Sequence, residues 1–491
     1  MDLLTGTSRA GDWSKPLGEL SGLSTDSRHT KQGHVFFGLP GSQVHGAEFI
    51  PYAVRMGAHV IVTDAQGLEK AQAIMGDVPL PVLISANPRR ALARAASRWY
   101  REQPKSMVAV TGTNGKTSVA SFTRQIWEEM GLEAVNLGTT GVEGAVERPL
   151  SHTTPDPLTL HETLGDLFHH GVTHVAMEAS SHGLSQARLD GVRLDAAAFT
   201  NITRDHLDYH PTFEAYLDAK AALFTRVLPK DGVAVVNVDV DHGAHMAEAA
   251  ARRGIDVLRV GRTPDCALRI MGSRFDGSGQ DLRFSVHGKD HVVRLDLIGG
   301  FQAENALVAA GLALATGVGA QDLPEALSAL VGVRGRMQEV ARRDNGAPVF
   351  VDYSHTPDAL RAALRALRPH VLGRLVVVFG AGGDRDPGKR PLMGEAVARE
   401  ADVAFVTDDN PRSEDPAVIR RAILAAIPQA TEVGDRAEAI LAGVDALQPG
   451  DALLIAGKGH ETGQEVDGTV LPFDDAEQAS IAVAALEGRL A

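Results

Sequence analysis

The sequence predicts three α/β domains whose sheets are mainly parallel. The chain has 491 residues, which is more than a single hydrophobic core usually holds. From about residue 107 onward, short apolar runs alternate with helical patterns, as expected for β-α units stacked around a parallel sheet. We place the three domains at residues 1–103, 104–335 and 336–491.

Two series of buried strands are predicted, one in each of the later domains. The first comprises residues 108–110, 174–177, 196–199 and 233–236, and the second comprises 349–351, 375–379, 403–406 and 453–456. Between the two series, alternating residues around Gly288 predict an antiparallel pair that closes the central domain, at 281–286 and 291–297. Helices are expected at 302–316 and 323–330. The region before residue 104 forms a third, smaller α/β unit.

Composition restricts the classes of function. A formal net charge of −14 argues against non-specific nucleic-acid binding, which requires a basic surface. The single cysteine, Cys266, cannot form an internal disulfide, and the N-terminus lacks the basic and apolar stretches of a secretory signal. No segment approaches the roughly 18 apolar residues of a membrane span. We therefore expect a cytoplasmic enzyme with neither a nucleic-acid partner nor a membrane span.

Polar segments follow directly on the predicted strands. They are rich in Gly, Asp, Asn and His, and they cover residues 112–117, 178–182, 200–210, 352–357, 380–386, 407–412 and 457–461. In parallel α/β sheets, ligands bind outside the carboxyl ends of the strands. The sequence therefore predicts two active-site faces opposed across a cleft.

The first of these segments reads as a phosphate loop between a buried strand at 107–111 and a helix at 118–130. Its residues are Gly112, Thr113, Asn114, Gly115, Lys116 and Thr117. The glycines let the backbone wrap phosphates, Lys116 reaches the terminal phosphates and Thr117 can bind Mg²⁺. The eight-residue P-loop pattern has glycine where this chain has Val110. The alternative is a glycine-rich turn that carries Lys-Thr by chance.

Taken in order, the strand-end motifs resemble those of the Mur ligases, in particular the tripeptide synthetase branch. A phosphate loop without the first glycine is typical of Mur ligases and of folylpolyglutamate synthases. The other motifs are Met177-Glu-Ala-Ser-Ser-His, Thr200 to His210, Gly335-Arg-Met-Gln, Val351-Asp-Tyr-Ser-His-Thr-Pro, Gly380 to Met393, Asp409-Asn-Pro-Arg and Gly457-Lys-Gly-His-Glu. The resemblance implies a small N-terminal uridine-nucleotide domain, a central P-loop ATPase-like domain and a C-terminal Rossmann-like domain.

The resemblance also implies a reaction of peptidoglycan synthesis. ATP would phosphorylate a carboxylate of UDP-N-acetylmuramoyl-L-alanyl-D-glutamate, and the amine of a diamino acid would attack the acyl phosphate, giving ADP and phosphate. Such a step brings anions together and calls for Mg²⁺ and cationic side chains. The partners would be ATP, the UDP-linked dipeptide and the diamino acid, and we expect a monomer.

Roles for individual residues follow from the matched motifs. Glu178, His206 and Thr117 would contact Mg²⁺, and Lys220 would carry a carbamate (N6-carboxylysine) that holds a second ion; Lys116, Glu178, His206 and Lys220 form the catalytic set. By itself, Lys220 reads as an ordinary solvated or snorkelling lysine. Asn305, Arg336 and Asp352 would bind adenine, phosphate and ribose, although Asn305 also reads as helix surface and Arg336 as a linker cation.

The remaining motif residues would bind the other two substrates. The uridine-diphosphate end would contact Ser27, His45 and Gly46, and the sugar and dipeptide end would contact Thr153, Thr154, Ser180 and Arg188. The amino-acid pocket would comprise Arg385, Asp409, Asn410, Pro411, Arg412, Gly457 and Glu461. The guanidinium of Arg412 suits the distal carboxylate of meso-diaminopimelate, which is favoured over L-lysine or L-ornithine. A folylpolyglutamate synthase-like ligase and a non-catalytic ATP-binding regulator remain alternatives.

Overall fold

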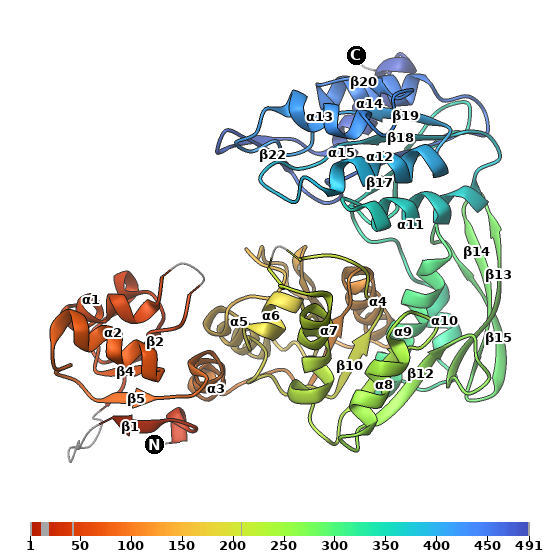
Figure 1. Ribbon diagram of the computed structural model, residues 1–491. Coiled ribbons are helices and arrows are strands. Elements are labelled where there is room, and N and C mark those ends of the chain that lie inside the picture. The colour runs from red at the N-terminus through yellow and green to blue at the C-terminus, as the bar shows by residue number, and fades with distance from the viewer. Residues whose placement is uncertain (1, 11–18, 42–43, 208, 490–491) are drawn as a thin grey trace.

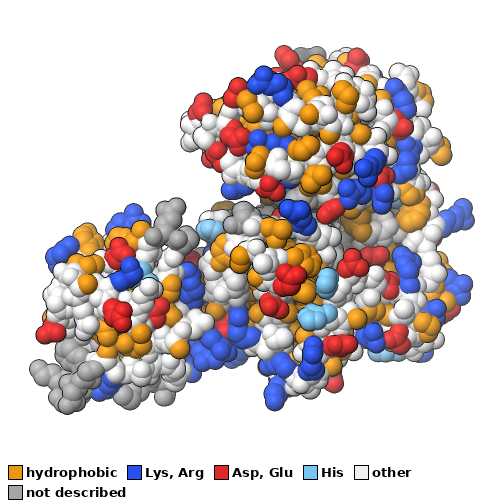
Figure 2. Space-filling view, in the orientation of Figure 1, with side chains coloured by type: hydrophobic (Ala, Val, Ile, Leu, Met, Phe, Trp, Pro, Cys, Tyr) orange, Lys and Arg blue, Asp and Glu red, His pale blue; other side chains and the backbone are white. Residues whose placement is uncertain are grey.

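The computed structural model shows three large sheets in three successive parts of the chain, and a two-stranded sheet in the last part (Figure 1). It describes residues 2–10, 19–41, 44–207 and 209–489. Figure 2, in the same orientation, shows the C-terminal domain overhanging the central one, with an open angle between it and the N-terminal domain. Within the described residues, no helix is both long and apolar enough to cross a membrane.

The N-terminal domain has a five-stranded sheet in the order β1-β5-β4-β3-β2, parallel except for β1. Apolar clusters cover both faces of this sheet. Its elements are β1 (Ser8–Ala10), β2 (Gly22–Ser24), β3 (His34–Phe37), α1 (Ile50–Arg55), β4 (Val60–Thr63), α2 (Ala65–Met75), β5 (Val82–Ile84) and α3 (Pro88–Tyr100).

The central domain has ten strands in the order β15-β14-β13-β12-β11-β10-β6-β9-β7-β8. The pairs from β13 to β7 are parallel. Its strands are β6 (Ser106–Thr111), β7 (Ala134–Gly138), β8 (Gly141–Gly144), β9 (His174–Glu178), β10 (Ala196–Phe199), β11 (Val233–Asn237), β12 (Asp256–Gly261), β13 (Leu268–Asp276), β14 (Gly279–Val286) and β15 (Lys289–Leu295). Its helices are α4 (Lys116–Glu129), α5 (Pro157–His169), α6 (Ser181–Ser185), α7 (Phe213–Ala222), α8 (Gly243–Ala251), α9 (Phe301–Ala315) and α10 (Leu323–Ser328).

The C-terminal domain has six strands in the order β16-β17-β21-β18-β19-β20, parallel except for β16, and a separate hairpin of β22 and β23. Its strands are β16 (Gln338–Arg342), β17 (Pro348–Asp352), β18 (Leu375–Phe379), β19 (Val403–Val406), β20 (Thr431–Glu432), β21 (Ala452–Ala456), β22 (Gly463–Val466) and β23 (Thr469–Pro472). Its helices are α11 (Pro357–Leu367), α12 (Lys389–Glu400), α13 (Pro416–Leu424), α14 (Arg436–Asp445) and α15 (Asp475–Leu486).

The differences from the sequence-based expectations lie mainly at the edges of elements. The expected antiparallel pair is a three-stranded unit, because β13 pairs with β14 as well. Helix α4 begins at Lys116, two residues earlier than expected, since the left-handed Gly115 ends the loop directly before it. Helix α7 gives way to a π-helical turn at Leu223–Val227. The predicted limits of the domains fall in connections without regular structure.

Polar contacts connect the central domain with each of its neighbours. Arg90 of α3 pairs with Asp190 at 2.8 Å on the N-terminal side. On the other side, His370 Nε2 accepts the Gly299 amide at 3.1 Å, and its Nδ1 lies 2.6 Å from the Asp276 carbonyl. Because Nε2 is the acceptor, Nδ1 carries the proton and donates. This neutral imidazole fixes the C-terminal domain above the carboxyl edge of the central sheet.

Candidate active site

The loop between β6 and α4 wraps a space at the carboxyl edge of the central sheet. Gly115 has φ +86°, and a Cβ atom there would lie 2.6 Å from the side-chain oxygen of Asn305. A larger residue would be strained and would collide with α9. The next strand end braces the loop, because Thr200 donates to the Asn114 carbonyl at 2.6 Å and the Asn114 amide donates to Asn201 Oδ1 at 3.0 Å. This backbone forms a fixed phosphate cradle before the N-terminus of α4.

The half-buried Lys116 and the buried Lys220 meet at the back of the cradle. Lys116 Nζ donates to the carbonyl oxygens of Gly112 and Thr113 at 3.0 and 2.9 Å. Lys220 Nζ, from α7, donates to the same Gly112 carbonyl at 2.6 Å and lies 4.6 Å from the centre of the Tyr216 ring. Burial lowers the pKa of Lys116, and burial followed by the charge of Lys116 lowers the pKa of Lys220 well below its usual value. At a given pH, the amine of Lys220 is therefore uncharged in a larger fraction of the molecules than the amine of an exposed lysine is.

A carboxylate and a hydroxyl adjoin the cradle. Glu178 Oε1 accepts from the Thr117 hydroxyl at 3.0 Å and from the Thr139 amide at 2.8 Å, while Oε2 accepts from the Thr139 hydroxyl at 3.2 Å. The guanidinium of Arg336 donates to Thr117 Oγ1 at 3.0 Å. Hydroxyl and carboxylate oxygens are the ligands that Mg²⁺ prefers. The residues present therefore fit a Mg²⁺ ion beside bound phosphates.

The segment after β10 adds an imidazole and a second carboxylate. His206 has a left-handed backbone with φ +53°, and its amide donates to Asp205 Oδ1 at 2.8 Å. Its ring lies 5.0 Å from the ring of His182. All three side chains line the cleft described below. Asp208, in the same motif, lies outside the described residues.

The C-terminal domain supplies the opposite wall. Asp352, at the end of β17, accepts from the Met337 amide at 2.8 Å and from the Ser354 amide at 2.9 Å. Arg336 lies 4.6 Å from the centre of the Tyr353 ring. Apolar side chains of α9 and α11 complete the wall, namely Phe301, Val308, Ala359, Ala362 and Ala363. An apolar surface that ends at a carboxylate suits a flat base attached to a hydroxylated sugar.

These elements enclose one cleft of about 710 Å³ between the central and C-terminal domains. The predicted residues that line it are Thr113, Asn114, Gly115, Lys116, Thr117, Thr153, Thr154, Glu178, Ser180, Arg188, His206, Asn305, Arg336 and Asp352. Lys220 reaches the cradle from behind, through the Gly112 carbonyl. The structure therefore brings the predicted ATP, metal and dipeptide residues to a single space.

The residues expected to bind uridine lie elsewhere. Ser27, His45 and Gly46 are all among the described residues, and they belong to the N-terminal domain, away from the lining of this cleft. His45 has a local structural role, since its Nδ1 accepts the Ala47 amide at 3.0 Å and its Nε2 lies 3.2 Å from Asp64 Oδ1. Their contacts with a uridine nucleotide stay a prediction.

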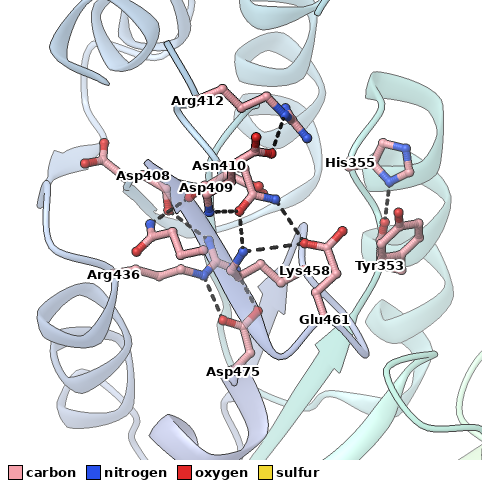
Figure 3. Close-up of polar contacts among 12 residues, drawn as sticks. Tyr353, His355, Asp408, Asp409, Asn410, Arg412, Arg436, Lys458, Glu461 and Asp475 are labelled. Atoms are coloured by element: carbon pink, nitrogen blue, oxygen red, sulfur yellow. Dashed lines mark hydrogen bonds and ion pairs between the residues drawn. The ribbon is translucent and has the colours of Figure 1, made fainter. Parts of the chain in front are cut away.

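The residues predicted to bind the amino acid form a second cluster (Figure 3). Asn410 and Arg412 follow β19, and Glu461 follows β21, so the loops after the two strands that flank β18 meet. Asn410 Nδ2 donates to Glu461 Oε2 at 3.0 Å, and Arg412 Nε contacts Glu465 Oε2 at 3.0 Å. Asp409, Pro411 and Gly457 are in the same two loops, whereas Arg385 is exposed on the loop after β18.

Tyr353 connects this cluster with the cleft. It lines the cleft, and its ring centre lies 5.0 Å from that of His460, the residue before Glu461. Burial, followed by the negative charge of Glu461, raises the pKa of Tyr353 to about 12. The neutral phenol thus stands between the phosphate cradle and the amino-acid cluster, which makes the two sites adjoining parts of one active centre.

A buried ion pair supports both loops of the cluster from below. Arg436 Nε and Nη2 each bind Asp475 at 2.7 Å, and both side chains have 0% exposure. Arg436 Nη2 also donates to the Ala456 carbonyl at 3.1 Å, and Nη1 donates to the Asp408 carbonyl at 3.3 Å. The guanidinium therefore holds the ends of β19 and β21 together.

Removing one partner of this pair should destabilise the protein strongly. In Asp475→Ala, the Arg436 guanidinium would stay buried without its counter-charge, so we expect the free energy of unfolding to fall by about 3–5 kcal/mol. Urea unfolding measures this change. As a control, Glu395→Ala breaks an exposed pair with Arg399 and should change stability by less than about 0.5 kcal/mol. Equal losses in the two variants would contradict the prediction.

Several cleft residues were not singled out from the sequence. Thr139 follows β7, a strand that the apolar pattern did not reveal, and Asn237 is the last residue of β11. Thr200, Thr203 and Asp205 belong to a segment that the sequence had marked as part of the site. From that segment, only His206 was predicted to bind Mg²⁺. The rule that polar residues at strand ends face the ligand would have found all of these once the strands were placed.

Family comparisons agree with this geometry. Three family models match successive parts of the chain: "Mur ligase family, catalytic domain" at residues 19–100, "Mur ligase middle domain" at 110–313 and "Mur ligase, glutamate ligase domain" at 335–459. Together they span most of its length. The chain belongs to the Mur ligase family.

Mur ligases of known name align with nearly the whole chain. A relative from Bradyrhizobium diazoefficiens is 52% identical over 470 residues, covering 95% of both chains, and one from Caulobacter vibrioides is 48% identical over 476 residues, covering 96% of both. Both are named UDP-N-acetylmuramoyl-L-alanyl-D-glutamate–2,6-diaminopimelate ligase. A solved structure of a ligase with that name is 34% identical, with a TM-score of 0.69 and 95% coverage of both chains.

A more distant Mur ligase structure shares only the fold. The MurF ligase from Thermotoga maritima in complex with ADP is 16% identical, with a TM-score of 0.61, and covers 96% of this chain and 99% of its own. Together with the closer relatives, these likenesses confirm the predicted family, the three-domain α/β fold class and the class of ATP-dependent ligase. The roles of individual site residues and the domain limits stay predictions.

Proposed function

We propose that this Mur ligase joins 2,6-diaminopimelate to UDP-N-acetylmuramoyl-L-alanyl-D-glutamate, with ATP converted to ADP and phosphate. The observation that carries the proposal is the meeting of the phosphate cradle and the Asn410–Glu461 cluster at Tyr353. The names of relatives that are 52% and 50% identical support the same reaction. The product would be a precursor of peptidoglycan.

The proposed chemistry has two steps. A carboxylate oxygen of the dipeptide attacks the γ-phosphorus, and the bond from that phosphorus to ADP breaks. The amine nitrogen then bonds to the acyl carbon, phosphate leaves with the electrons of the broken C–O bond, and the amine loses a proton. Lys116 and the N-terminus of α4 would stabilise the charge of the transferring group. Thr153, Thr154, Ser180 and Arg188 would orient the dipeptide end.

Bound Mg²⁺, held by Thr117, Glu178 and His206, would neutralise phosphate charge. Lys220 would act as a carbamate, because its buried amine has a lowered pKa and the neutral amine is the form that adds CO₂. The modification replaces a cation by an anion, which gives a second ion an oxygen ligand. Asn305, Arg336 and Asp352 would bind the rest of ATP, and Ser27, His45 and Gly46 would bind uridine diphosphate.

Phosphate release tests the proposed function. The purified protein is incubated with Mg²⁺, ATP and the UDP-linked dipeptide, and diaminopimelate, L-lysine or L-ornithine is added separately. We expect strong phosphate release with diaminopimelate and formation of the tripeptide product by mass spectrometry. Phosphate release with lysine or ornithine, and not with diaminopimelate, would identify that amino acid as the substrate. No phosphate release with any of the three would refute the ligase proposal.

Arg412→Ala should remove the preference for diaminopimelate. The guanidinium is the cation expected to bind the distal carboxylate, and a missing partner of this kind changes kcat/KM by about 100-fold or more. We expect kcat/KM for diaminopimelate to fall by about that factor, while the low value for lysine changes little. The control is Arg399→Ala, which removes an exposed guanidinium of α12. A parallel fall for both amino acids would show that Arg412 does not read the distal carboxylate.

The compartment and the assembly belong to the same proposal. Cys266 is buried and free, in keeping with a reducing cytoplasm, where ATP is available. We propose that the enzyme works there as a monomer. Light scattering after gel filtration would measure the mass of the particle.

A further inference from the structure

Lys458 is a buried lysine in the loop after β21, and none of the roles above uses it. Its side chain has 0% exposure, and burial lowers its pKa. Its Nζ donates to Asn410 Oδ1 at 2.8 Å and lies 3.5 Å from Glu461 Oε2 (Figure 3). Burying an ammonium group is costly, and an apolar side chain of the same size would avoid that cost. The position of the charge therefore calls for an explanation beyond packing.

The contacts of Asn410 supply that explanation. Its Oδ1 accepts from Lys458 Nζ and also from the Glu465 amide at 3.0 Å, so both lone pairs of the oxygen are occupied by groups that can only donate. The amide nitrogen must therefore face the other side, where it donates to Glu461 Oε2 at 3.0 Å. Among the described residues, Nδ2 has only this hydrogen bond, so its second N–H can donate to a ligand while the oxygen cannot accept from one.

We propose that Lys458 is a positioning residue that determines amino-acid specificity, because it locks the Asn410 amide with its donor side available to the substrate. A donor suits the distal carboxylate of diaminopimelate, which lysine and ornithine lack. Without Lys458, one of the two donors to the Asn410 oxygen is lost, so the amide is held less firmly with its donor side toward the substrate. The inference rests on the proposed function, since it takes the loop after β19 as the amino-acid site.

Lys458→Met tests the inference, because methionine keeps the unbranched chain of lysine as far as Cε and removes the Nζ donor. We expect KM for diaminopimelate to rise by about 10- to 100-fold, which is the range for a lost hydrogen bond to a charged group. KM for ATP and kcat at saturation should stay within about threefold, and the preference for diaminopimelate over lysine should narrow about tenfold. Lys230→Met, at an exposed position, is the control and should leave every constant unchanged.

A double-mutant cycle separates positioning from general structural damage. If Lys458 acts through Asn410, then Lys458→Met combined with Asn410→Ala should bind diaminopimelate no more weakly than Asn410→Ala alone. If the two substitutions instead weaken diaminopimelate binding independently, so that their separate fold-changes multiply in the double variant, the inference is overturned. Asn410→Asp keeps an acceptor for Lys458 but removes both donors, so it tests the premise that Asn410 acts on the substrate as a donor even if Lys458→Met does not fold. An unchanged KM for diaminopimelate in Asn410→Asp would also overturn it.

The two failures are distinguishable. If the unmodified enzyme uses diaminopimelate and Lys458→Met keeps both its KM and its selectivity, only the inference on Lys458 fails. If the unmodified enzyme uses lysine and not diaminopimelate, the proposed substrate is wrong, and a donor-locked Asn410 is wrong with it.

Discussion

Lys116→Met should reduce kcat by at least about 1,000-fold while the protein stays folded. The Lys116 ammonium lies at the phosphate cradle, within 3.0 Å of the Gly112 carbonyl and 2.9 Å of the Thr113 carbonyl. When ATP binds, the Lys116 ammonium should contact the transferring phosphoryl group. Preorganised cations at that position raise kcat by factors of about 10³ or more. Initial rates of phosphate release, measured with all three substrates saturating, give the result.

Two further measurements make this prediction specific. Lys105→Met replaces an exposed lysine just before β6, and it should leave kcat unchanged. The thermal midpoint of Lys116→Met should stay close to that of the unmodified enzyme, because relief of the desolvation of this half-buried ammonium offsets the loss of its two hydrogen bonds. A kcat within tenfold of the unmodified value would contradict a role for Lys116 in phosphoryl transfer.

Lys220→Ala should be almost inactive, and short carboxylic acids such as acetate should restore part of the activity. The side chain is 1% exposed, and its amine lies 2.6 Å from the Gly112 carbonyl at the back of the cradle. If the working form is a carbamate, alanine removes an anion next to the phosphates, and we expect kcat to fall by about 100-fold or more. A small carboxylate that diffuses into the vacated space supplies the missing charge.

The carbamate has a readout that does not depend on activity. With ¹³C-labelled CO₂, the unmodified protein should give a carbamate resonance that Lys220→Ala lacks. Lys230→Ala, at an exposed lysine, should keep both the resonance and the activity. Full activity of Lys220→Ala without added carboxylic acid would refute the role of this lysine as a carbamate.

Much of the central site could be predicted from local patterns. The strand 106–111, the glycine-rich turn and the following helix are contiguous, so their geometry depends on residues that are neighbours in sequence. Glu178 was placed at a strand end for the same reason. Thr139 was missed because β7 is short and its pattern is weak, yet its amide and hydroxyl hold both oxygens of Glu178.

The amino-acid cluster was less accessible to such reasoning. The sequence predicted that Arg412 binds a carboxylate of the substrate. In the structure, Arg412 contacts the carboxylate of Glu465, which belongs to the β22–β23 hairpin. No turn pattern in the sequence had predicted that hairpin. Arg436 and Lys458 were not assigned roles, because a cation in a sequence gives no sign of whether its charge is buried. Only their 0% exposure and their partners show that they support the two loops.

The sequence by itself determined the order of the β-α units, the phosphate loop and the family, since these depend on short-range periodicity and on motifs of a few residues. The tertiary structure decided which distant groups meet. Lys220 reaches the Gly112 carbonyl 108 residues away, Arg336 reaches Thr117 across 219 residues, and Lys458 fixes the amide of Asn410 from 48 residues away. Burial and hydrogen-bond direction at these contacts arise from packing of the whole chain, so no local pattern could set the charge of Lys220 or the orientation of Asn410.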